Sequence, residues 1–287
     1  MALLPPGFLD CVVAIGSDDG GPSGSPRWIG TGFLVGRPDT TESGSVRYRV
    51  FLVTNKHVLK DRTSFAVGFN PEKGAPIKIY HFSLVHDGTK LWTGHYRDDV
   101  DVAVALLHAG LLREDERRFN YFRIDEGNVL SIEQMKAIGV SEGDFVYILG
   151  YPMALVDQDW HYAIVRSGSI ARIGDALERR KPEFLLDATV FPGNSGGPVV
   201  LKPEIVSIEG TKPIKSACLI GIVSSYLSYS DVAFSIQSQK PRVIFEENSG
   251  LASAILSEFV LEAIEAHIKR MSDEPTPALV LQPKDNI

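Results

Sequence analysis

Short apolar runs separated by turn-forming residues follow one another along most of the chain. The runs are rich in Val, Ile and Phe, and clusters of Gly, Pro, Asp and Ser divide them. Such runs predict β-strands, and many short strands joined by tight turns are typical of β-sandwiches and β-barrels. The predicted strands are Val12–Ile15, Gly32–Val35, Val50–Val53, Phe65–Phe69, Ile77–Phe82, Val102–Leu107, Phe145–Leu149, Ala163–Val165, Phe184–Val190, Pro198–Leu201 and Ala217–Ser224.

Two polar stretches interrupt this pattern. Residues 111–140 contain the charged run Leu112–Arg118 and then Ser131–Ala137, which predicts a helical turn. We interpret residues 111–140 as a connector between two β units. The second stretch, Tyr226–Asn248, predicts a long surface loop, because it is polar over most of its length.

The segment Ser257–Met271 has a different periodicity. Most of its apolar residues recur three or four positions apart with Glu and Lys between them, which predicts an amphipathic helix. Ser257 is the expected N-cap, because a serine side chain can accept a hydrogen bond from a free amide of the first helical turn. The polar, proline-containing tail from Ser272 is expected to be frayed.

The composition narrows the class of protein. The chain has 287 residues, of which 44% are hydrophobic and 23% charged, and it holds 26 glycines and 17 prolines. These values fit one or two globular units and exclude a mostly disordered chain, a collagen and a coiled coil. The net charge of −7 and the lack of long basic runs argue against nucleic acid as a partner.

The cysteines and the N-terminus bear on the compartment. Cys11 and Cys218 allow at most one disulfide, and two buried free thiols are the favoured alternative. Residues Met1–Asp10 lack the basic and apolar regions of a signal peptide, and no apolar run is long enough to cross a membrane. We therefore predict a cytoplasmic protein that has no membrane partner.

The strongest chemical feature is the segment Phe191–Pro198, which reads Phe-Pro-Gly-Asn-Ser-Gly-Gly-Pro. Three glycines surround Ser195 between two predicted strands, so backbone N–H groups can converge on one point. The amides of Gly193 and Ser195 would then form a hole for a developing oxyanion. The alternative is a glycine-rich hairpin in which the serine has no chemical role.

Two further segments carry candidate side chains. His57 comes shortly after the predicted strand Val50–Val53 and can serve as a general base at the edge of a cleft. Asp101 precedes the predicted strand Val102–Leu107, where a partly buried carboxylate needs a partner such as an imidazole N–H. The alternatives are an inert histidine and an ordinary surface turn.

The order of these residues, His57 then Asp101 then Ser195, on a β-rich chain resembles that of the trypsin-like (chymotrypsin-fold) serine peptidases. Within that family the chain is similar to the HtrA/DegP-like bacterial branch, over roughly residues 10–256. The segments that carry the resemblance are Gly30–Val35, Thr54–Val58, Asp101–Ala103, Gly143–Val146, Gly150–Pro152, Ser167–Ile170, Asp187–Thr189, Pro192–Pro198 and Gly221–Ser224.

The resemblance implies an all-β protein made of two six-stranded antiparallel β-barrels with a C-terminal α-helix. It places the first barrel at residues 8–110, the connector at 111–140, the second barrel at 141–256, the helix at 257–271 and a flexible tail at 272–287. It implies a serine endopeptidase that acts on a protein or peptide substrate and needs no metal or organic cofactor.

The same resemblance assigns roles to the three side chains. Ser195 would be the nucleophile, His57 the general base and then acid, and Asp101 the group that orients His57. The amides of Gly193 and Ser195 would form the oxyanion hole. Asp99 is the rival of Asp101, because both would face the same side of an extended strand, but the Asp-Val-Ala sequence favours Asp101.

Two features depart from the family pattern. Asn194 stands where the digestive enzymes have an aspartate that pairs with a newly cut N-terminus. We therefore expect another means of ordering the loop, such as an activating partner or an oligomer.

The chain after the barrels is too short for the PDZ modules of HtrA-type enzymes, which favours a regulated protease with a dedicated target.

The resemblance also locates the substrate pocket at Thr189, Ser224, Ser225 and Tyr226. Thr189 is uncharged, which disfavours cleavage after Arg or Lys. Val223 stands where Glu-specific relatives have a histidine, which argues against cleavage after Glu. We expect a small or medium apolar residue before the cleaved bond.

Two other functions compete with a serine endopeptidase. One is a latent or inactive protease-fold binding module that needs a partner to form its site. The other is an esterase, against which the order of the three residues and the strand-rich flanks argue.

The six histidines other than His57 show no metal-binding spacing, and surface or core roles are expected for them.

Overall fold

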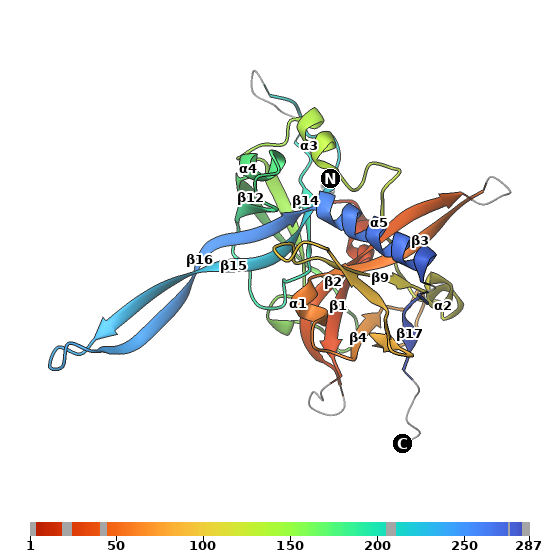
Figure 1. Ribbon diagram of the computed structural model, residues 1–287, viewed down its shortest axis with the longest axis horizontal. Coiled ribbons are helices and arrows are strands. Elements are labelled where there is room, and N and C mark those ends of the chain that lie inside the picture. Colours follow the sequence, from red (N-terminus) through yellow and green to blue (C-terminus); the bar gives the residue numbers. More distant parts are fainter. Residues whose placement is uncertain (1–3, 19–24, 41–44, 205–210, 275, 283–287) are drawn as a thin grey trace.

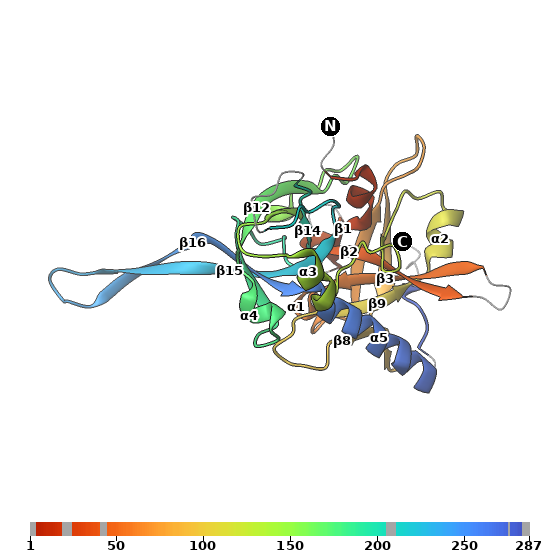
Figure 2. The same ribbon diagram turned by 90° about the horizontal axis from the view of Figure 1, so that it is seen from above.

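The computed structural model describes residues 4–18, 25–40, 45–204, 211–274 and 276–282. Two β units pack against each other, and a C-terminal helix lies across the first of them (Figure 1). A two-stranded arm projects far from the second unit, and both views show that it stands apart from the rest of the molecule (Figures 1 and 2). Among the described residues, no helix is long and apolar enough to cross a membrane.

The first unit is a nine-stranded sheet. Its strands lie in the order β17-β5-β4-β1-β2-β3-β9-β8, and β10 pairs in parallel with β2. A 3₁₀ helix, η1 (Pro6–Cys11), precedes the sheet, the short helix α1 (Lys56–Leu59) follows β3, and β6 (Val85–His86) pairs with β7 (Thr89–Lys90) apart from it. The strands of the sheet are β1 (Val12–Ser17), β2 (Arg27–Thr40), β3 (Val46–Thr54), β4 (Ser64–Phe69), β5 (Lys78–Ser83), β8 (Trp92–Gly94), β9 (Ala103–Leu107), β10 (Phe122–Arg123) and β17 (Val280–Leu281).

The central strands of this sheet are buried on both faces, which explains their uninterrupted apolar runs. In β3, Phe51 and Val53 face a core that also contains residues of the second unit. Val50 and Leu52 face a separate core inside the first unit. Because successive side chains of a strand point to opposite faces, a strand between two cores is apolar at every position.

The second unit is a closed six-stranded barrel in the order β11-β12-β13-β16-β15-β14. All its neighbouring strands are antiparallel. Its loops contain the 3₁₀ helix η3 (Pro152–Ala154) and the short helix α4 (Gly174–Leu177). The strands are β11 (Phe145–Gly150), β12 (Ile164–Arg172), β13 (Glu183–Asp187), β14 (Pro198–Leu201), β15 (Leu219–Phe234) and β16 (Pro241–Leu256).

The predicted all-β class, the six-stranded second barrel and the C-terminal helix are confirmed. Every predicted apolar run overlaps an observed strand. The first unit differs in detail from a six-stranded barrel, because β8, β10 and β17 join its six predicted strands and the sheet does not close. These three added strands are too short to give a periodic signal in the sequence.

The connector between the β units contains α2 (Ala109–Glu114), β10 and α3 (Ile132–Ile138). Ser131 caps α3, since its Oγ accepts from the Gln134 amide while the Gln134 side chain accepts from the Ser131 amide. Gly139 ends the helix with a left-handed φ of 82°. The helical turn predicted at residues 131–137 is therefore confirmed.

The surface loop predicted at Tyr226–Asn248 is wrong. The strands β15 and β16 continue through this region as an antiparallel hairpin, with Ser228 opposite Asn248 and Ala233 opposite Val243. Most of the side chains of the hairpin are exposed. The polar residues that indicated a loop therefore belong to strands that face no core.

The C-terminal helix α5 (Ser257–Asp273) lies where the periodicity predicted it. The predicted N-cap is wrong, because Leu256 occupies the cap position and Ser257 is the first helical residue. The Oγ of Ser257 instead donates to the carbonyl oxygen of Leu130 at 2.5 Å. This serine anchors the start of α5 to the connector.

The expectation of a frayed tail is wrong for part of the tail. Leu279 is buried, and Val280 and Leu281 form β17 on the outer edge of β5. These apolar side chains extend the core of the first unit, which outweighs the polar composition around them. Residues 275 and 283–287 of the same prediction lie outside the described residues.

The two cysteines are free and buried, as expected. Burial raises the pKa of the Cys11 thiol and of the Cys218 thiol. Both thiols are therefore protonated near neutral pH and pack as small apolar side chains.

Candidate active site

His57 lies on α1, directly after β3. Asn55 is completely buried beside it, and its Nδ2 donates to the carbonyl oxygen of Asp101 at 2.7 Å. Lys56 donates from Nζ to the carbonyl oxygen of Arg97 at 2.7 Å. These two bonds hold the turn that carries His57 against the loop that carries Asp101.

Asp101 contacts His57 at two points. Its Oδ2 lies 2.5 Å from His57 Nδ1, and its Oδ1 accepts from the His57 amide at 3.1 Å. Burial raises the pKa of Asp101, but the hydrogen bonds and charge of His57 outweigh it, so the pKa lies below its ordinary value. An ionised Asp101 favours the tautomer with the proton on Nδ1, which leaves His57 Nε2 able to accept a proton.

Asp99 is excluded as the partner of His57. It lies in a turn before β9, and both its carboxylate oxygens bind the guanidinium of Arg97, at 3.0 and 2.6 Å. The extended strand that would have placed Asp99 and Asp101 on one face begins only at Ala103. The structure therefore pairs Asp101 with His57 and leaves Asp99 in an exposed ion pair.

The loop with Ser195 lies between the two β units and depends on its glycines. Gly193 and Gly196 have positive φ angles of 97° and 84°, which other residues adopt only with strain. A Cβ on Gly196 would also overlap the carbonyl oxygen of Thr31. Conformation and close packing thus both require glycine here.

The amides of Gly193 and Ser195 are the predicted donors of an oxyanion hole. The carbonyl oxygen of Pro192 accepts from the Met153 amide at 2.6 Å, so the Gly193 N–H of the same trans peptide points the opposite way. Among the described residues, neither the Gly193 nor the Ser195 amide has a backbone or side-chain acceptor. Two free N–H groups therefore remain for a negatively charged oxygen.

Thr31 of β2 joins the Ser195 loop to the first unit and was missed as a site residue. Its Oγ1 donates to the Gly193 carbonyl oxygen at 2.6 Å and accepts from the Tyr151 amide at 3.0 Å. Its amide donates to the Ser195 carbonyl oxygen at 2.9 Å. The only sequence signal was its place in the Gly-Thr-Gly segment, which gives no hint of these distant partners.

Asn194 orders the loop from inside. It is buried, and its Oδ1 accepts from the Phe191 amide at 3.0 Å. The Asn194 amide closes the same turn by donating to the Phe191 carbonyl oxygen at 3.0 Å. In this structure the contacts of Asn194 and Thr31 hold the loop, and the activating partner or oligomer stays a prediction.

Ser195 shares a cavity of about 350 Å³ with His57 and Asp101. In the part of the chain that the structure describes, Ser195 Oγ is not hydrogen-bonded to His57; it donates to the Ser224 carbonyl oxygen at 3.3 Å. The cavity is lined by His57, Asp101, Val190, Phe191, Pro192, Ser195, Val223, Ser224, Ser225 and Tyr226. Three residues far apart in the sequence are therefore brought to one cleft.

The structure brings three of the four predicted pocket residues to this cleft. Ser224, Ser225 and Tyr226 line it, whereas Thr189 is exposed and does not. The reason is the alternation after β13, which turns Val190 inward and Thr189 outward. The apolar side chain at this wall is therefore that of Val190.

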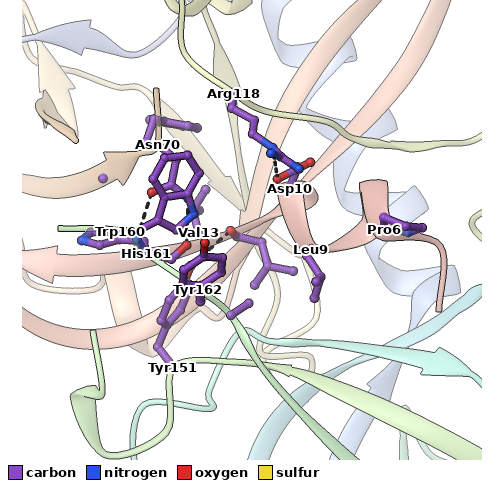
Figure 3. A pocket seen from close by; sticks show the side chains of 14 residues that line it. Pro6, Leu9, Asp10, Val13, Asn70, Arg118, Tyr151, Trp160, His161 and Tyr162 are labelled. Carbon is purple, nitrogen blue, oxygen red and sulfur yellow. Dashed lines mark hydrogen bonds and ion pairs between the residues drawn. The ribbon is translucent and has the colours of Figure 1, made fainter. Parts of the chain in front are cut away.

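A second cavity, of about 140 Å³, lies beside His161 and Tyr151 (Figure 3). Asn70 Nδ2 donates to the His161 carbonyl oxygen at 2.8 Å, and Asn70 Oδ1 accepts from the His161 amide at 2.9 Å. Burial lowers the pKa of His161 to about 4. None of the predicted site residues lines this cavity. His161 thus has a core role.

In the described residues, no group of three or more His, Cys, Asp or Glu side chains is arranged to bind a metal ion.

Comparison with known proteins identifies relatives of this chain. The family model described as "Trypsin-like peptidase domain" matches residues 30–204. A probable periplasmic serine endoprotease DegP-like of Rhizobium meliloti (strain 1021) is 29% identical over 199 residues. The match covers 67% of this chain and 30% of that relative, so the chain spans less than a third of the relative's length.

One solved structure with a similar chain is the MamO protease domain from Magnetospirillum magneticum in its apo form. It has a TM-score of 0.44 and 17% sequence identity, and the match covers 89% of this chain and 96% of that chain.

Proposed function

Because the chain belongs to the trypsin-like peptidase domain family, we propose that it is a serine endopeptidase. The observation that carries the proposal is the cleft that Ser195 lines together with the His57–Asp101 pair. The two free amides of Gly193 and Ser195 lie in the loop that forms part of the same cleft. Together these groups supply a nucleophile, a base, a group that orients the base and an oxyanion site.

The proposed reaction follows from the atoms present. Ser195 Oγ attacks the carbonyl carbon of the scissile peptide bond while His57 Nε2 takes the hydroxyl proton. The carbonyl oxygen becomes an oxyanion that accepts hydrogen bonds from the Gly193 and Ser195 amides. The C–N bond then breaks as His57 returns the proton to the leaving amine, and an ester to Ser195 remains.

Water completes the proposed cycle. His57 Nε2 takes a proton from the water molecule, whose oxygen attacks the ester carbonyl through a second oxyanion. Collapse of that oxyanion releases the acid product and returns the proton to Ser195 Oγ. Throughout, the carboxylate of Asp101 stabilises the positive charge that forms on His57.

The substrate in this proposal is a protein or peptide chain that lies along the cleft. Val190 and Val223 provide apolar surface in it, which supports the preference for a small or medium apolar residue before the cleaved bond. The cytoplasmic location, the regulation and the dedicated target stay predictions.

A fluorophosphonate probe tests the proposal, because it phosphonylates a serine only where the oxyanion site and base are assembled. We expect the wild-type chain to be labelled and Ser195→Ala to be unlabelled. Asp101→Asn should reduce the labelling rate by about 10³-fold or more, since His57 would adopt the wrong tautomer. Asp99→Asn is the matched control and should be labelled at the wild-type rate.

A latent binding module is the second candidate, and one contact favours it. The Ser195 hydroxyl donates to the Ser224 carbonyl oxygen, so a side-chain rotation must precede attack. If the purified chain is not labelled but is labelled in cell extract, a partner drives this rotation. If Ser195 is unlabelled under both conditions, the endopeptidase proposal is rejected.

A further inference from the structure

The projecting hairpin has no intramolecular role that would explain its length. We define the arm as residues 227–249 of β15 and β16, which stands away from the body in both views (Figures 1 and 2). No residue of the arm is buried. An isolated two-stranded hairpin is only marginally stable in water, so a long arm of this kind is expected to be covered by another chain.

The arm exposes apolar side chains on both of its faces. Val232 pairs with Ile244 on one face, and Ala233 pairs with Val243 on the other. Ile244 is 64% exposed and Phe245 is 52% exposed. A partner must therefore contact the apolar residues near the end of the arm.

The outer edge of β16 is free along the arm. β16 pairs with β13 only through residues 251–255, and residues 241–248 pair with β15 alone. The backbone N–H and C=O groups that face away from β15 thus have no strand beside them. A free edge of this kind can accept another strand.

The charges along this edge select one partner strand. Reading along β16, the basic residues Lys240 and Arg242 come before the apolar run Val243–Phe245, and the acidic residues Glu246 and Glu247 come after it. Among the described residues, no ion pair involves any of these four charges, and all four are exposed. A strand with positive charge at one end and negative charge at the other is complementary to an antiparallel copy of itself.

We propose that two copies of this chain associate by pairing the outer edges of β16 in antiparallel orientation, about a two-fold axis at Ile244. The axis places Arg242 of each copy opposite Glu246 of the other. It also places Val243 opposite Phe245, and Ile244 opposite its own copy. The two hairpins become one four-stranded sheet, with the same contacts made twice.

Two details fit this register. Pro241 has no N–H group to donate, so it marks the end of the paired segment. The side chains of Val232 and Ile244 from both copies form one apolar row across the new sheet, since residues opposite each other lie on one face. A parallel arrangement would instead place Arg242 against Arg242 and Glu246 against Glu246, so it is disfavoured.

A charge-swap experiment with the full chain tests both the partner and its orientation. Sedimentation velocity should show a concentration-dependent dimer of the wild-type chain. Arg242→Glu alone, or Glu246→Arg with Glu247→Arg, should each raise the dimer dissociation constant by about tenfold or more, because like charges then face each other twice. An equal mixture of the two variants should restore the dimer, since position 242 and position 246 then carry opposite charges at both contacts.

Cross-linking provides a second readout that does not depend on charge. Ile244→Cys should form a disulfide-linked dimer under mild oxidation, because the two-fold axis brings the two Cα atoms within about 6 Å. Ser230→Cys, on the inner strand of the same arm, is the matched control and should remain monomeric. Both native cysteines are buried, so they do not compete.

Three outcomes would overturn the proposal. One is a wild-type chain that stays monomeric up to about 100 µM. Another is a dimer that neither charge reversal weakens, or that the mixture does not restore. The third is a monomer in which Arg242→Glu slows cleavage of a folded protein but not of a short peptide, which would make the arm a substrate-docking element. The first two readouts do not depend on peptidase activity, so they stand whether or not the proposed function is correct.

Discussion

Thr31 shows how a single side chain controls the geometry of the candidate site. Its hydroxyl is completely buried and makes two hydrogen bonds, one to the Gly193 carbonyl oxygen and one from the Tyr151 amide. The first bond fixes the peptide that joins Gly193 to Asn194, within the loop that carries Ser195. Because both bonds cross from the first β unit to the second, Thr31 also ties the Ser195 loop to the unit that carries His57.

We predict that Thr31→Val lowers kcat more than it changes KM. Valine has nearly the same shape but offers no hydroxyl, so the Gly193 carbonyl and the Tyr151 amide lose a buried partner. The expected loss is about 1–3 kcal/mol of unfolding free energy and roughly tenfold or more in kcat. Thr31→Ser retains the hydroxyl and should keep most of the activity.

Peptide hydrolysis and urea unfolding of both variants check this prediction. A Thr31→Val chain with wild-type kcat would show that the loop is held without this hydroxyl.

The residues of the site differ in how far the sequence could predict them. His57, Asp101 and Ser195 occur in recognisable local segments, and the structure brings them to one cleft. Thr31 and Asn55 act through partners more than forty positions away in the chain. Local patterns contain no information on such contacts, because only the folded arrangement of distant segments creates them.

Secondary structure was predictable where a strand or helix buries one or both faces. The apolar runs of β1 to β5 and the periodicity of α5 follow directly from the cores they face. The outer part of β15 and β16 faces no core, so its sequence carries no sustained alternation and only short apolar runs such as Val243–Phe245. β17 packs on the core of the first unit, but its two residues are too few to give a periodic signal, so the sequence predicted a frayed tail there.

The helix α5 makes the packing on the first unit sensitive to acid. His267 is completely buried against Phe51, and its Nδ1 lies 2.8 Å from Thr93 Oγ1. Burial, together with the charge of Arg270, lowers the pKa of His267 from 6.5 to about 4. The folded chain therefore disfavours the protonated imidazole.

We predict that stability falls as the pH decreases from 6.5 towards 4. Between these values the unfolded chain binds a proton at His267 that the folded chain does not. The free energy of unfolding is therefore highest above pH 6.5 and decreases below it. The expected loss from His267 is roughly 2 kcal/mol between pH 7 and pH 5. His161 adds a similar loss, since its pKa is lowered to about 4 as well.

Urea unfolding at pH 7 and pH 5 measures this effect. His267→Gln removes one titrating group, so the difference between the two pH values should be smaller in this variant by roughly the loss assigned to His267. Only the difference is compared, because the substitution itself also changes stability at pH 7. An unchanged difference would mean that His267 is not the group responsible.

The whole molecule is held together by one core that crosses between the β units. Residues of the sheet, such as Phe33 and Phe51, belong to the same buried cluster as Phe184 and Ile222 of the barrel. The helix α5 leaves the barrel at β16 and packs on the sheet of the first unit. There Phe259 contacts the ring of His95, with the ring centroids 5.4 Å apart.

Polar contacts of α5 join the same two units. Glu262 binds Arg179, which follows α4 of the barrel, at 3.4 Å, and its other carboxylate oxygen lies 3.0 Å from His95 Nε2 of the first unit. Arg270, near the end of α5, donates to the carbonyl oxygens of Trp92 and Lys90 at 3.0 Å. The helix therefore acts as a strap, and unfolding of one unit exposes the buried surface of the other.

A chain of this length with two separate cores would unfold in two steps, whereas a shared core and strap predict a single cooperative transition. We expect heat unfolding followed by calorimetry to show one peak. Phe259→Ala, which removes a buried ring of α5, should destabilise the protein by about 3–5 kcal/mol. Hydrogen exchange of the β4 amides and the β14 amides should report that loss equally. A second calorimetric peak, or a loss confined to β4, would show instead that the two β units unfold independently.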